Sequence, residues 1–173
     1  MRRGIVASAK KNSTTIASRG SGTPADNGVA TWATKTNAVD GAVGTNPNTY
    51  ATWTNSTSSG VGYIEVSGYA FSSIPAGSTI LDVKVVIRHL CSNTGRITST
   101  VFQAFDGATS VSGSQGTTLS TAAHDETMNF VCTLAQIKSA TFKIRVTTTH
   151  AANTQSLVFS LDHADVTVSY APP

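Results

Sequence analysis

The densest group of side chains that could bind a metal ion or move a proton is the run His124-Asp125-Glu126. In a loop these residues could act as metal ligands, which must converge on one point. On a strand, neighbouring residues point to opposite sides, so the three cannot all reach one ion. No second ligand group stands at a recognisable metal-site spacing. We therefore expect a structural or solvated role for this run and no bound metal.

A second group, Asp162-His163 with Asp165, has the residue types of a catalytic triad if a nearby serine joins it. The chain has no G-x-S-x-G motif that would present such a nucleophile. We expect this group to be solvated at a bulged sheet edge. His89 and His150 end strand segments and are interpreted as surface residues.

Two other kinds of catalytic site receive little support. Glu65 and Asp82 could pair as the carboxylates of a glycoside hydrolase, but both fall on polar strand faces, where isolated charges are expected. The glycine-containing segments 41–44 and 113–116 lack the lysine and the helix of a phosphate-binding loop. The sequence thus favours a protein that is not an enzyme and needs no cofactor.

Strands must carry these residues, because the composition disfavours helices. Charged residues make up 12% of the chain, and the good helix formers Glu, Lys, Gln and Leu are scarce beside Thr and Val. No heptad repeat is sustained, and no apolar run approaches the roughly 18 residues of a membrane-spanning helix. With 173 residues the chain can close one ordinary core. We expect an all-β protein with one domain.

Alternating polar and apolar residues predict about eight strands. The expected segments are 29–33, 50–54, 62–71, 78–90, 96–105, 128–134, 141–149 and 157–170. Within 78–90 the residues expected to face inward are Leu81, Val83, Val85 and Ile87. The segment 134–139 is the one plausible helical turn.

The last strand segment changes phase. Leu157, Phe159 and Leu161 occupy odd positions, whereas Val166 and Val168 occupy even ones. One face can stay inward only if an extra residue is inserted within 162–165, which predicts a β-bulge or a corner. Because no helix is available for parallel crossovers, the predicted fold is an antiparallel β-sandwich of jelly-roll type.

Basic residues are concentrated at the start of the chain. The five are Arg2, Arg3, Lys10, Lys11 and Arg19. No Asp or Glu precedes Asp26, and the net charge is +3. We expect an extended basic arm at 1–28 and a β-sandwich domain at 29–173.

A basic arm can bind nucleic acid, an anionic membrane or an acidic patch on a protein, or remain a solvated tail. Residues 1–31 contain no aromatic side chain to stack on bases, and five charges give a modest phosphate-binding contribution. A protein partner is therefore favoured, with no specific nucleic acid and no membrane.

The sequence favours neither a secretion signal nor a disulfide. The apolar stretch 5–9 is interrupted by Ser8 and ended by two lysines, so it is too short for a secretion signal. Cys91 and Cys132 lie on or beside predicted strands, where they could form one disulfide or serve as small buried residues. We favour free thiols.

Trp32 and Trp53 each fall in a short strand segment. Burial of so large a ring is worth several kcal/mol, which favours a core or hairpin-packing role. Exposed, these rings could instead stack on a sugar, as could Tyr50, Tyr63 and Tyr69.

Several short motifs resemble a β-sandwich domain of tailed-phage virion proteins, often seen in phages of actinobacteria. They are Trp32, Asn37-Ala38, Asp40-Gly41, Asn46-Pro47-Asn48 and Tyr50-Ala51-Thr52, then Tyr69-Ala70-Phe71, Ile74-Pro75-x-Gly77-x-x-Ile80-x-x-Val83-x-Val85 and Leu161-Asp162-x-x-Asp165-Val166-Thr167-Val168-Ser169-Tyr170. The resemblance covers most of 32–170. Members commonly place an N-P-x-N-A element just after the Trp, and here Asn37-Ala38 lacks that proline.

The resemblance implies an accessory protein of the capsid surface or the tail, often trimeric and without catalytic residues. We expect a capsid decoration or cement protein in the virion, assembled in the host cytoplasm. It would dock on the major capsid protein or another virion protein through Arg2, Arg3, Lys10, Lys11 and Arg19. The alternative is a minor tail, tail-tip or fibre protein that binds host-envelope carbohydrate, with Trp32, Trp53 and Tyr50 as stacking residues.

Overall fold

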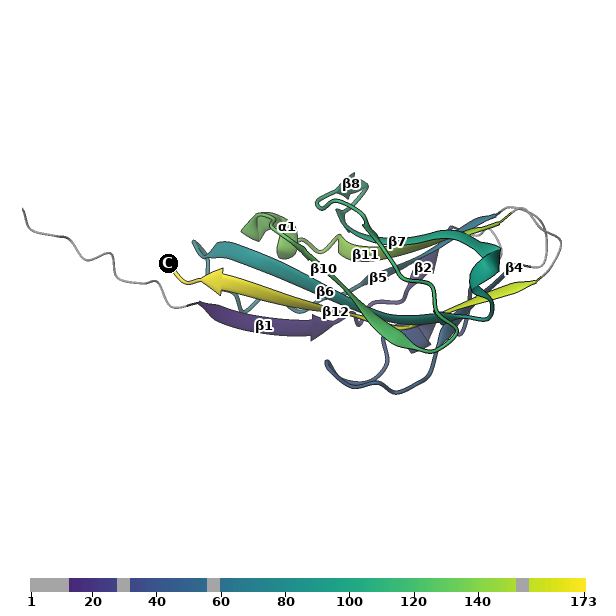
Figure 1. Ribbon diagram of the computed structural model, residues 1–173. Coiled ribbons are helices and arrows are strands. Elements are labelled where there is room, and N and C mark those ends of the chain that lie inside the picture. Colours follow the sequence, from purple (N-terminus) through teal and green to yellow (C-terminus); the bar gives the residue numbers. More distant parts are fainter. Residues whose placement is uncertain (1–12, 28–31, 56–59, 152–155) are drawn as a thin grey trace, which may run out of the picture.

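The computed structural model describes residues 13–27, 32–55, 60–151 and 156–173. Two antiparallel sheets stack on one another (Figure 1). Sheet A contains β1 (Thr14–Arg19), β3 (Trp32–Ala33), β4 (Ala51–Asn55), β6 (Thr79–Cys91), β10 (His124–Phe130) and β12 (Leu157–Ala171). Sheet B contains β2 (Ala25–Asp26), β5 (Val61–Ser67), β7 (Ile97–Asp106), β8 (Thr109–Ser110), β9 (Gln115–Gly116) and β11 (Phe142–His150). The predicted antiparallel β-sandwich of jelly-roll type is confirmed.

Strands that lie side by side in a sheet are mostly not consecutive in the sequence. Sheet A runs β10-β6-β12-β4-β3, and β1 also pairs with β12. Sheet B runs β2-β5-β11-β7-β8, and β9 also pairs with β7. Among the described residues, helical structure is confined to two 3₁₀ turns, Lys35–Ala38 and Thr94–Arg96, and to α1 (Leu134–Ile137), which confirms the predicted helical turn. No helix in the described segments is long and apolar enough to cross a membrane.

The core lies between the two sheets, where alternate residues of each strand point inward. In β11 and β5, for example, Ile144, Val146, Ile64 and Val66 are fully buried. Fully burying an aliphatic side chain of this kind contributes about 1.5–3 kcal/mol. The outward residues of the same strands remain partly exposed, so period-two alternation in the sequence predicts the sheet faces correctly here.

The predicted bulge in the last strand is confirmed at Asp162. Leu161 of β12 lies opposite His89 of β6 and His163 lies opposite Arg88, so Asp162 is the extra residue. The inward phase consequently passes from Leu161 to Ala164. The bulge lies within sheet A and not at its edge, because β12 pairs with β6 on one side and with β4 and β1 on the other.

A second irregularity corrects the expected inner face of β6. Ser169 of β12 pairs with Asp82 and the next residue, Tyr170, pairs with Ile80, so Leu81 has no register partner. Leu81 is 45% exposed, and Ile80 takes the buried position. A bulge shifts the alternation of inward and outward residues by one position. Counting every second residue back from Val83 therefore assigned Leu81 to the wrong face.

The described part of the expected arm, residues 13–27, belongs to the sandwich. β1 pairs with β12 from Thr14 opposite Tyr170 to Arg19 opposite Asp165, and β2 pairs with β5. Between them the chain passes so close to sheet B that a Cβ atom on Gly20 would lie 2.3 Å from Val66 Cγ1. Residues 13–27, which the sequence assigned to a separate arm, are therefore part of the fold, whereas residues 1–12 and the expected boundary at residue 28 are outside the described segments.

Both cysteines are free thiols, as expected. Cys91 is buried and Cys132 is half-buried. Burial raises the pKa of the Cys132 thiol to about 11. A thiol of this pKa carries little thiolate near neutral pH, so neither residue has the character of a reactive cysteine.

Candidate functional site

The tryptophans belong to the core. Trp53 is fully buried and Trp32 is 2% exposed, with its ring edge-on to Phe159 at a centroid distance of 6.1 Å. The core interpretation is confirmed, and neither indole is available to stack on a sugar. Tyr50 is half-buried, and its backbone carbonyl accepts hydrogen bonds from Thr34 Oγ1 and Asn37 Nδ2.

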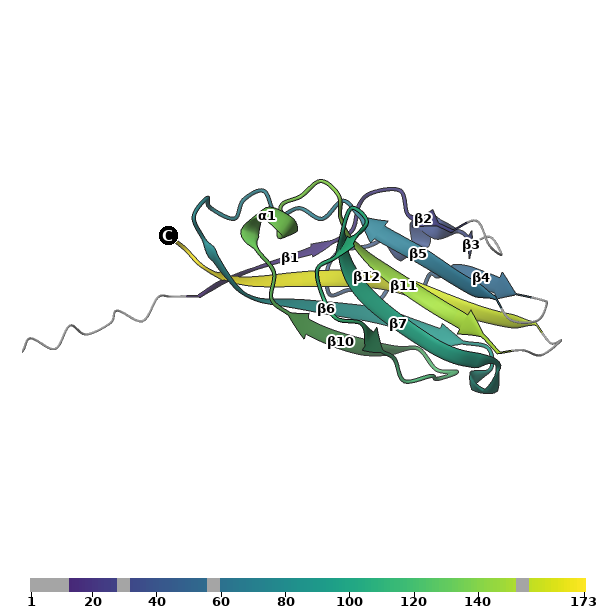
Figure 2. The ribbon, with the colours of Figure 1, turned by 90° about the horizontal axis from the view of Figure 1, so that it is seen from above.

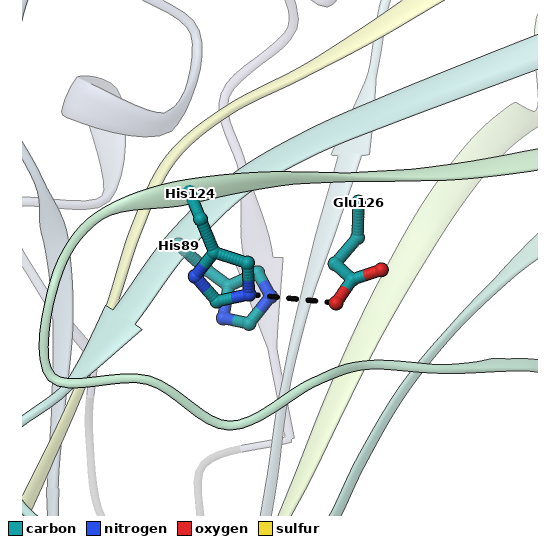
Figure 3. A group of neighbouring side chains, drawn as sticks. All are labelled: His89, His124 and Glu126. Atoms are coloured by element: carbon teal, nitrogen blue, oxygen red, sulfur yellow. Dashed lines mark ion pairs between the residues drawn. The ribbon is translucent and has the colours of Figure 1, made fainter.

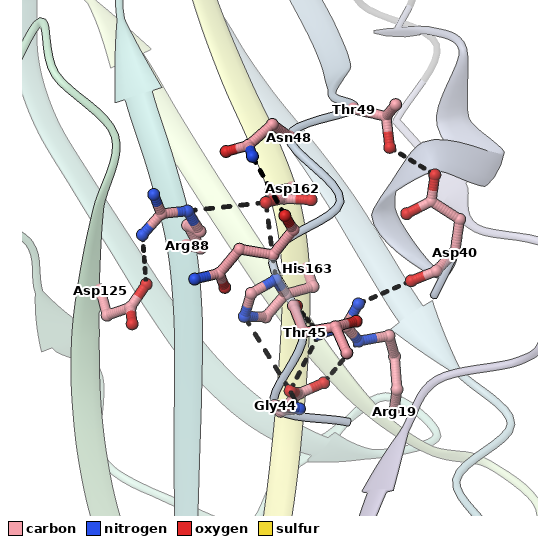
Figure 4. Close-up of polar contacts among 12 residues, drawn as sticks. Arg19, Asp40, Gly44, Thr45, Asn48, Thr49, Arg88, Asp125, Asp162 and His163 are labelled. Atoms are coloured by element: carbon pink, nitrogen blue, oxygen red, sulfur yellow. Dashed lines mark hydrogen bonds and ion pairs between the residues drawn. The ribbon is translucent and has the colours of Figure 1, made fainter. Parts of the chain in front are cut away.

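Arg19 is a structural residue and not a docking charge. Its Nε lies 2.7 Å from Asp165 Oδ1 and its Nη2 lies 3.0 Å from Asp165 Oδ2, a bidentate pair. Nη1 and Nη2 also donate to the backbone oxygens of Asp40 and Thr45, at 2.6 and 2.9 Å (Figure 4). Arg19 therefore fixes the 40–49 loop to the outer face of sheet A, which overturns its expected role as an anchor for a partner.

The Asp162-His163-Asp165 group is buried beneath the same loop. Asp162 is 0% exposed and His163 is 3% exposed, so the expected solvated role was wrong. Gly44 N donates to Asp165 Oδ2 at 2.9 Å, and Arg88 Nε lies 3.6 Å from Asp162 Oδ2. Burial raises the pKa of Asp162 and lowers the pKa of His163. Within the described part of the chain, the group contacts β1, the 40–49 loop and β6, which is the pattern of a structural cluster.

The expected surface positions of His89 and His150 were also wrong, since each is 1% exposed. His150 continues the inward phase of β11 after Val146 and Thr148, and His89 continues the inward phase of β6 after Ile87. The alternation of each strand thus predicted an inward position for both histidines, but the sequence analysis gave more weight to their polar character.

The 40–49 loop covers the outer face of sheet A, so the outer face of sheet B is the open face of the sandwich, although Phe105 on it is buried, at 9% exposed. Figure 2 shows β5, β11 and β7 side by side. We call their outward side chains the β5–β11–β7 face. It is formed by Tyr63, Glu65, Gln103, Phe105, Lys143 and Arg145. No pocket is found among the described residues.

Arg145 lies at the centre of this face, between two aromatic rings. Its guanidinium carbon is 4.4 Å from the ring centroid of Tyr63 and 4.2 Å from that of Phe105. Both distances lie well inside the range of cation–π contacts. Glu65 and Gln103 lie opposite Arg145 on the two flanking strands, so the register brings the group together.

Glu65 is held by two cations. Lys143 Nζ donates to Glu65 Oε2 at 2.8 Å, while Arg145 Nη2 and Nε donate to Oε1 at 2.6 and 2.9 Å. Burial alone raises the pKa of Glu65, but the hydrogen bonds from Lys143 and Arg145 hold it below its usual value. The carboxylate is therefore ionised at neutral pH.

The glycosidase pair considered from the sequence is not formed. Glu65 lies in sheet B and Asp82 lies in sheet A, on different layers of the sandwich. The polar face of 62–71 was recognised from its alternation, but the contribution of Phe105 and Gln103 depends on the pairing of β11 with β7, which no local pattern reveals.

No protein-family model matches the sequence, and no curated protein matches it significantly. Solved structures with a similar fold include a CBM4 protein, with a TM-score of 0.44, 12% identity, and coverage of 73% of this chain and 88% of that chain. A family 35 carbohydrate binding module from Clostridium thermocellum has a TM-score of 0.42 and 9% identity, over 92% of this chain and 99% of that one.

The enzymatically active domain of tailspike protein 4 of bacteriophage CBA120 is also similar, with a TM-score of 0.42 and 10% identity. The match covers 92% of this chain but 19% of the tailspike chain. Likenesses at this level of identity concern the fold, and the function must be inferred from the chain's own residues.

Proposed function

We propose that this chain is a non-enzymatic carbohydrate-binding module and that the β5–β11–β7 face is its binding surface. The observation that carries the proposal is the Tyr63–Arg145–Phe105 arrangement, bordered by Glu65 and Lys143 on the open side of sheet B. This face replaces Trp32 and Trp53 as the expected stacking surface, because both indoles are buried.

The chemistry of the face matches that of a sugar ring. A pyranose presents an apolar C–H face and a rim of hydroxyl groups that both donate and accept hydrogen bonds. Half-buried Tyr63 has Arg145 over one face of its ring and would offer the other ring face to the former. For the latter, Glu65 accepts, Lys143 and Arg145 donate, and the side-chain oxygen of Gln103 accepts, since its Nε2 already donates to Ser110 and Ser112.

The side chains are also held in place before a ligand arrives. Arg145 is fixed by two rings and a carboxylate, and Glu65 is fixed by two cations. Ordering a free, rotamer-rich side chain on binding costs about 0.5–1.5 kcal/mol, and this cost is reduced when the side chain is ordered beforehand. The absence of a pocket among the described residues suits an extended stretch of glycan more than a single enclosed sugar.

The opposite face of the sandwich is less suitable, because the 40–49 loop covers the middle of sheet A. Asp162, His163 and Asp165 lie beneath this loop and are at most 7% exposed. A catalytic role for the open face is disfavoured as well. A glycoside hydrolase needs a carboxyl group that can give up a proton, whereas Glu65 is an ionised partner of two cations.

The proposal is tested by measuring binding of the purified chain to cello-, xylo-, manno-, laminari-, galacto- and chito-oligosaccharides by calorimetry. We expect at least one of them to bind, and Tyr63→Ala to weaken that affinity about tenfold, corresponding to a lost contact of about 1.4 kcal/mol. Lys84→Ala, on the outer face of sheet A, is the matched surface control and should bind as the wild type does.

Tyr50→Ala tests the tyrosine that the sequence analysis placed with Trp32 and Trp53 as a stacking residue. Binding that is lost in Tyr50→Ala and kept in Tyr63→Ala would move the site away from sheet B. No binding to any oligosaccharide of the panel would contradict the proposed function itself. Melting temperatures of all variants are recorded alongside, so that a loss of binding is not confused with unfolding.

Capsid decoration, the first expectation from the sequence, stays a prediction without support from the described residues. Of its five docking charges, Arg19 is committed to Asp165, and Arg2, Arg3, Lys10 and Lys11 lie outside the described segments. A carbohydrate-binding module suits the alternative setting better, namely the tail or a fibre of a phage particle in contact with host-envelope glycan. That setting, and a trimeric state, rest on the resemblance of the sequence motifs.

A further inference from the structure

Two histidines and a glutamate meet where β10 pairs with β6, at the edge of sheet A. His124 of β10 lies directly opposite His89 of β6, and Glu126 lies two residues further along β10, on the same side of the strand. Figure 3 shows the two imidazoles and the carboxylate grouped together. The ring centroids of the two histidines are 4.4 Å apart.

The spacing of the donor atoms is close to that of a metal site. One ligand atom from each of His89, His124 and Glu126 lies within 4.8 Å of the other two. His124 Nε2 and Glu126 Oε1 are 3.4 Å apart. Ligands bound at about 2.0–2.1 Å to a tetrahedral zinc ion lie about 3.3 Å from one another, so this pair already has the required separation.

Neighbouring groups orient the two ligands on β10. His124 Nδ1 lies 3.2 Å from the carbonyl oxygen of Ala122, which can only accept a hydrogen bond. The proton is therefore assigned to Nδ1, and the lone pair of Nε2 faces the cluster. Thr118 N donates to Glu126 Oε1 at 2.6 Å and holds the carboxylate in place. Outer hydrogen bonds of this kind are typical of metal ligands.

His89 supplies an independent indication of a ligand. It is 1% exposed, and its Nε2 has no hydrogen-bond partner among the described residues. Buried polar atoms almost always have a partner. An unpaired nitrogen beside two other potential metal ligands therefore indicates that a partner binds here. The ring is stacked on Phe159 at a centroid distance of 5.4 Å, which fixes its orientation.

The cluster is also accessible. The side chains of His124 and Glu126 are 26% and 18% exposed, so an ion can reach them from solvent.

We propose that His89, His124 and Glu126 bind a divalent transition-metal ion of the zinc type, with water completing the coordination. Two imidazole nitrogens and one carboxylate favour Zn²⁺ over Ca²⁺ or Mg²⁺, which prefer sets of oxygen ligands. The ion would fasten the edge strand β10 to β6 and, through Glu126 and Thr118, to the segment that follows β9. The second ligand group absent from the local sequence is thus supplied by His89.

The test is calorimetric titration of the full-length, untagged, EDTA-treated chain with ZnCl₂ at pH 7, together with the visible spectrum of the Co²⁺-loaded protein. We expect one equivalent of Zn²⁺ to bind, a tetrahedral Co²⁺ absorption band and a higher melting temperature in the presence of zinc. His124→Gln and Glu126→Gln should each weaken Zn²⁺ binding by at least about tenfold and abolish the cobalt band.

Asp125→Asn is the matched control, because Asp125 lies between the two ligands and pairs with Arg88 instead. It should leave Zn²⁺ binding unchanged. His124 and Glu126 lie on a partly exposed edge strand, so their variants are expected to fold even if His89→Gln does not. The absence of Zn²⁺ binding at micromolar concentration would overturn the proposal and leave His124 and Glu126 as an ion pair. Equal affinity in the His124→Gln and Glu126→Gln variants would overturn it too.

Discussion

Arg19→Ala is expected to lower the free energy of unfolding by about 3–5 kcal/mol, the usual cost of removing one partner from a buried ion pair. The substitution leaves the carboxylate of Asp165, which is 7% exposed, without its cation. It also removes the donors to the carbonyl oxygens of Asp40 and Thr45, which hold the 40–49 loop on sheet A. Urea denaturation followed by tryptophan fluorescence measures the loss.

Two further variants separate an ion-pair effect from a general loss of packing. Arg19→Met combined with Asp165→Leu removes both charges, and it should recover much of the lost stability because no buried charge remains unpaired. Lys84→Ala, an exposed lysine in the same sheet, should change stability by less than about 0.5 kcal/mol. If Arg19→Ala is equally harmless, residues 13–19 form a free arm after all, and the pairing of β1 with β12 is wrong.

Trp53→Ala is expected to lower the free energy of unfolding by about 3–5 kcal/mol as well, the range for truncating a large aromatic core residue. The indole is fully buried and is so close to Gly62 that a Cβ atom on that glycine would lie 2.3 Å from Trp53 Cε2. The indole cannot move outward without opening the core between β4 and β5. Trp53→Phe keeps most of the apolar surface buried and should cost less. Thermal unfolding followed by circular dichroism measures both variants.

The same pair of variants decides between the two roles considered for the tryptophans. A core role predicts that folded Trp53→Phe binds oligosaccharide with wild-type affinity. An exposed stacking role predicts nearly unchanged stability for Trp53→Ala together with lost binding. Tyr50→Ala, at a half-buried position, is the matched control and should cost far less stability than Trp53→Ala.

The long strands could be predicted because one of their faces is apolar over many residues. Phe142, Ile144 and Val146 alternate with charged or hydroxyl residues, and the sheet buries the apolar residues. The phase change in the last strand likewise identified the bulge that the structure places at Asp162. In these segments the local period and the tertiary packing agree, so the sequence alone was sufficient.

The candidate sites could not be predicted, because each depends on strand pairing between distant residues. His89 and His124 become neighbours only through the register of β6 with β10, and Arg145 meets Phe105 only through that of β11 with β7. The burial of His163 depends on a loop that crosses the sheet from more than a hundred residues away in the sequence. Periodicity shows which residues share a face of a strand, but not which strand lies beside it or what covers it.

The most direct test of the central claim is amide NMR chemical-shift mapping of the full chain with an oligosaccharide that binds in the calorimetric panel. The account predicts that the largest shifts fall on β5, β11 and β7, at Tyr63, Glu65, Gln103, Lys143 and Arg145. It also predicts that they are lost in Tyr63→Ala and unchanged in Lys84→Ala. Shifts confined to sheet A or to the region around Tyr50 would contradict the assignment of the binding surface to sheet B.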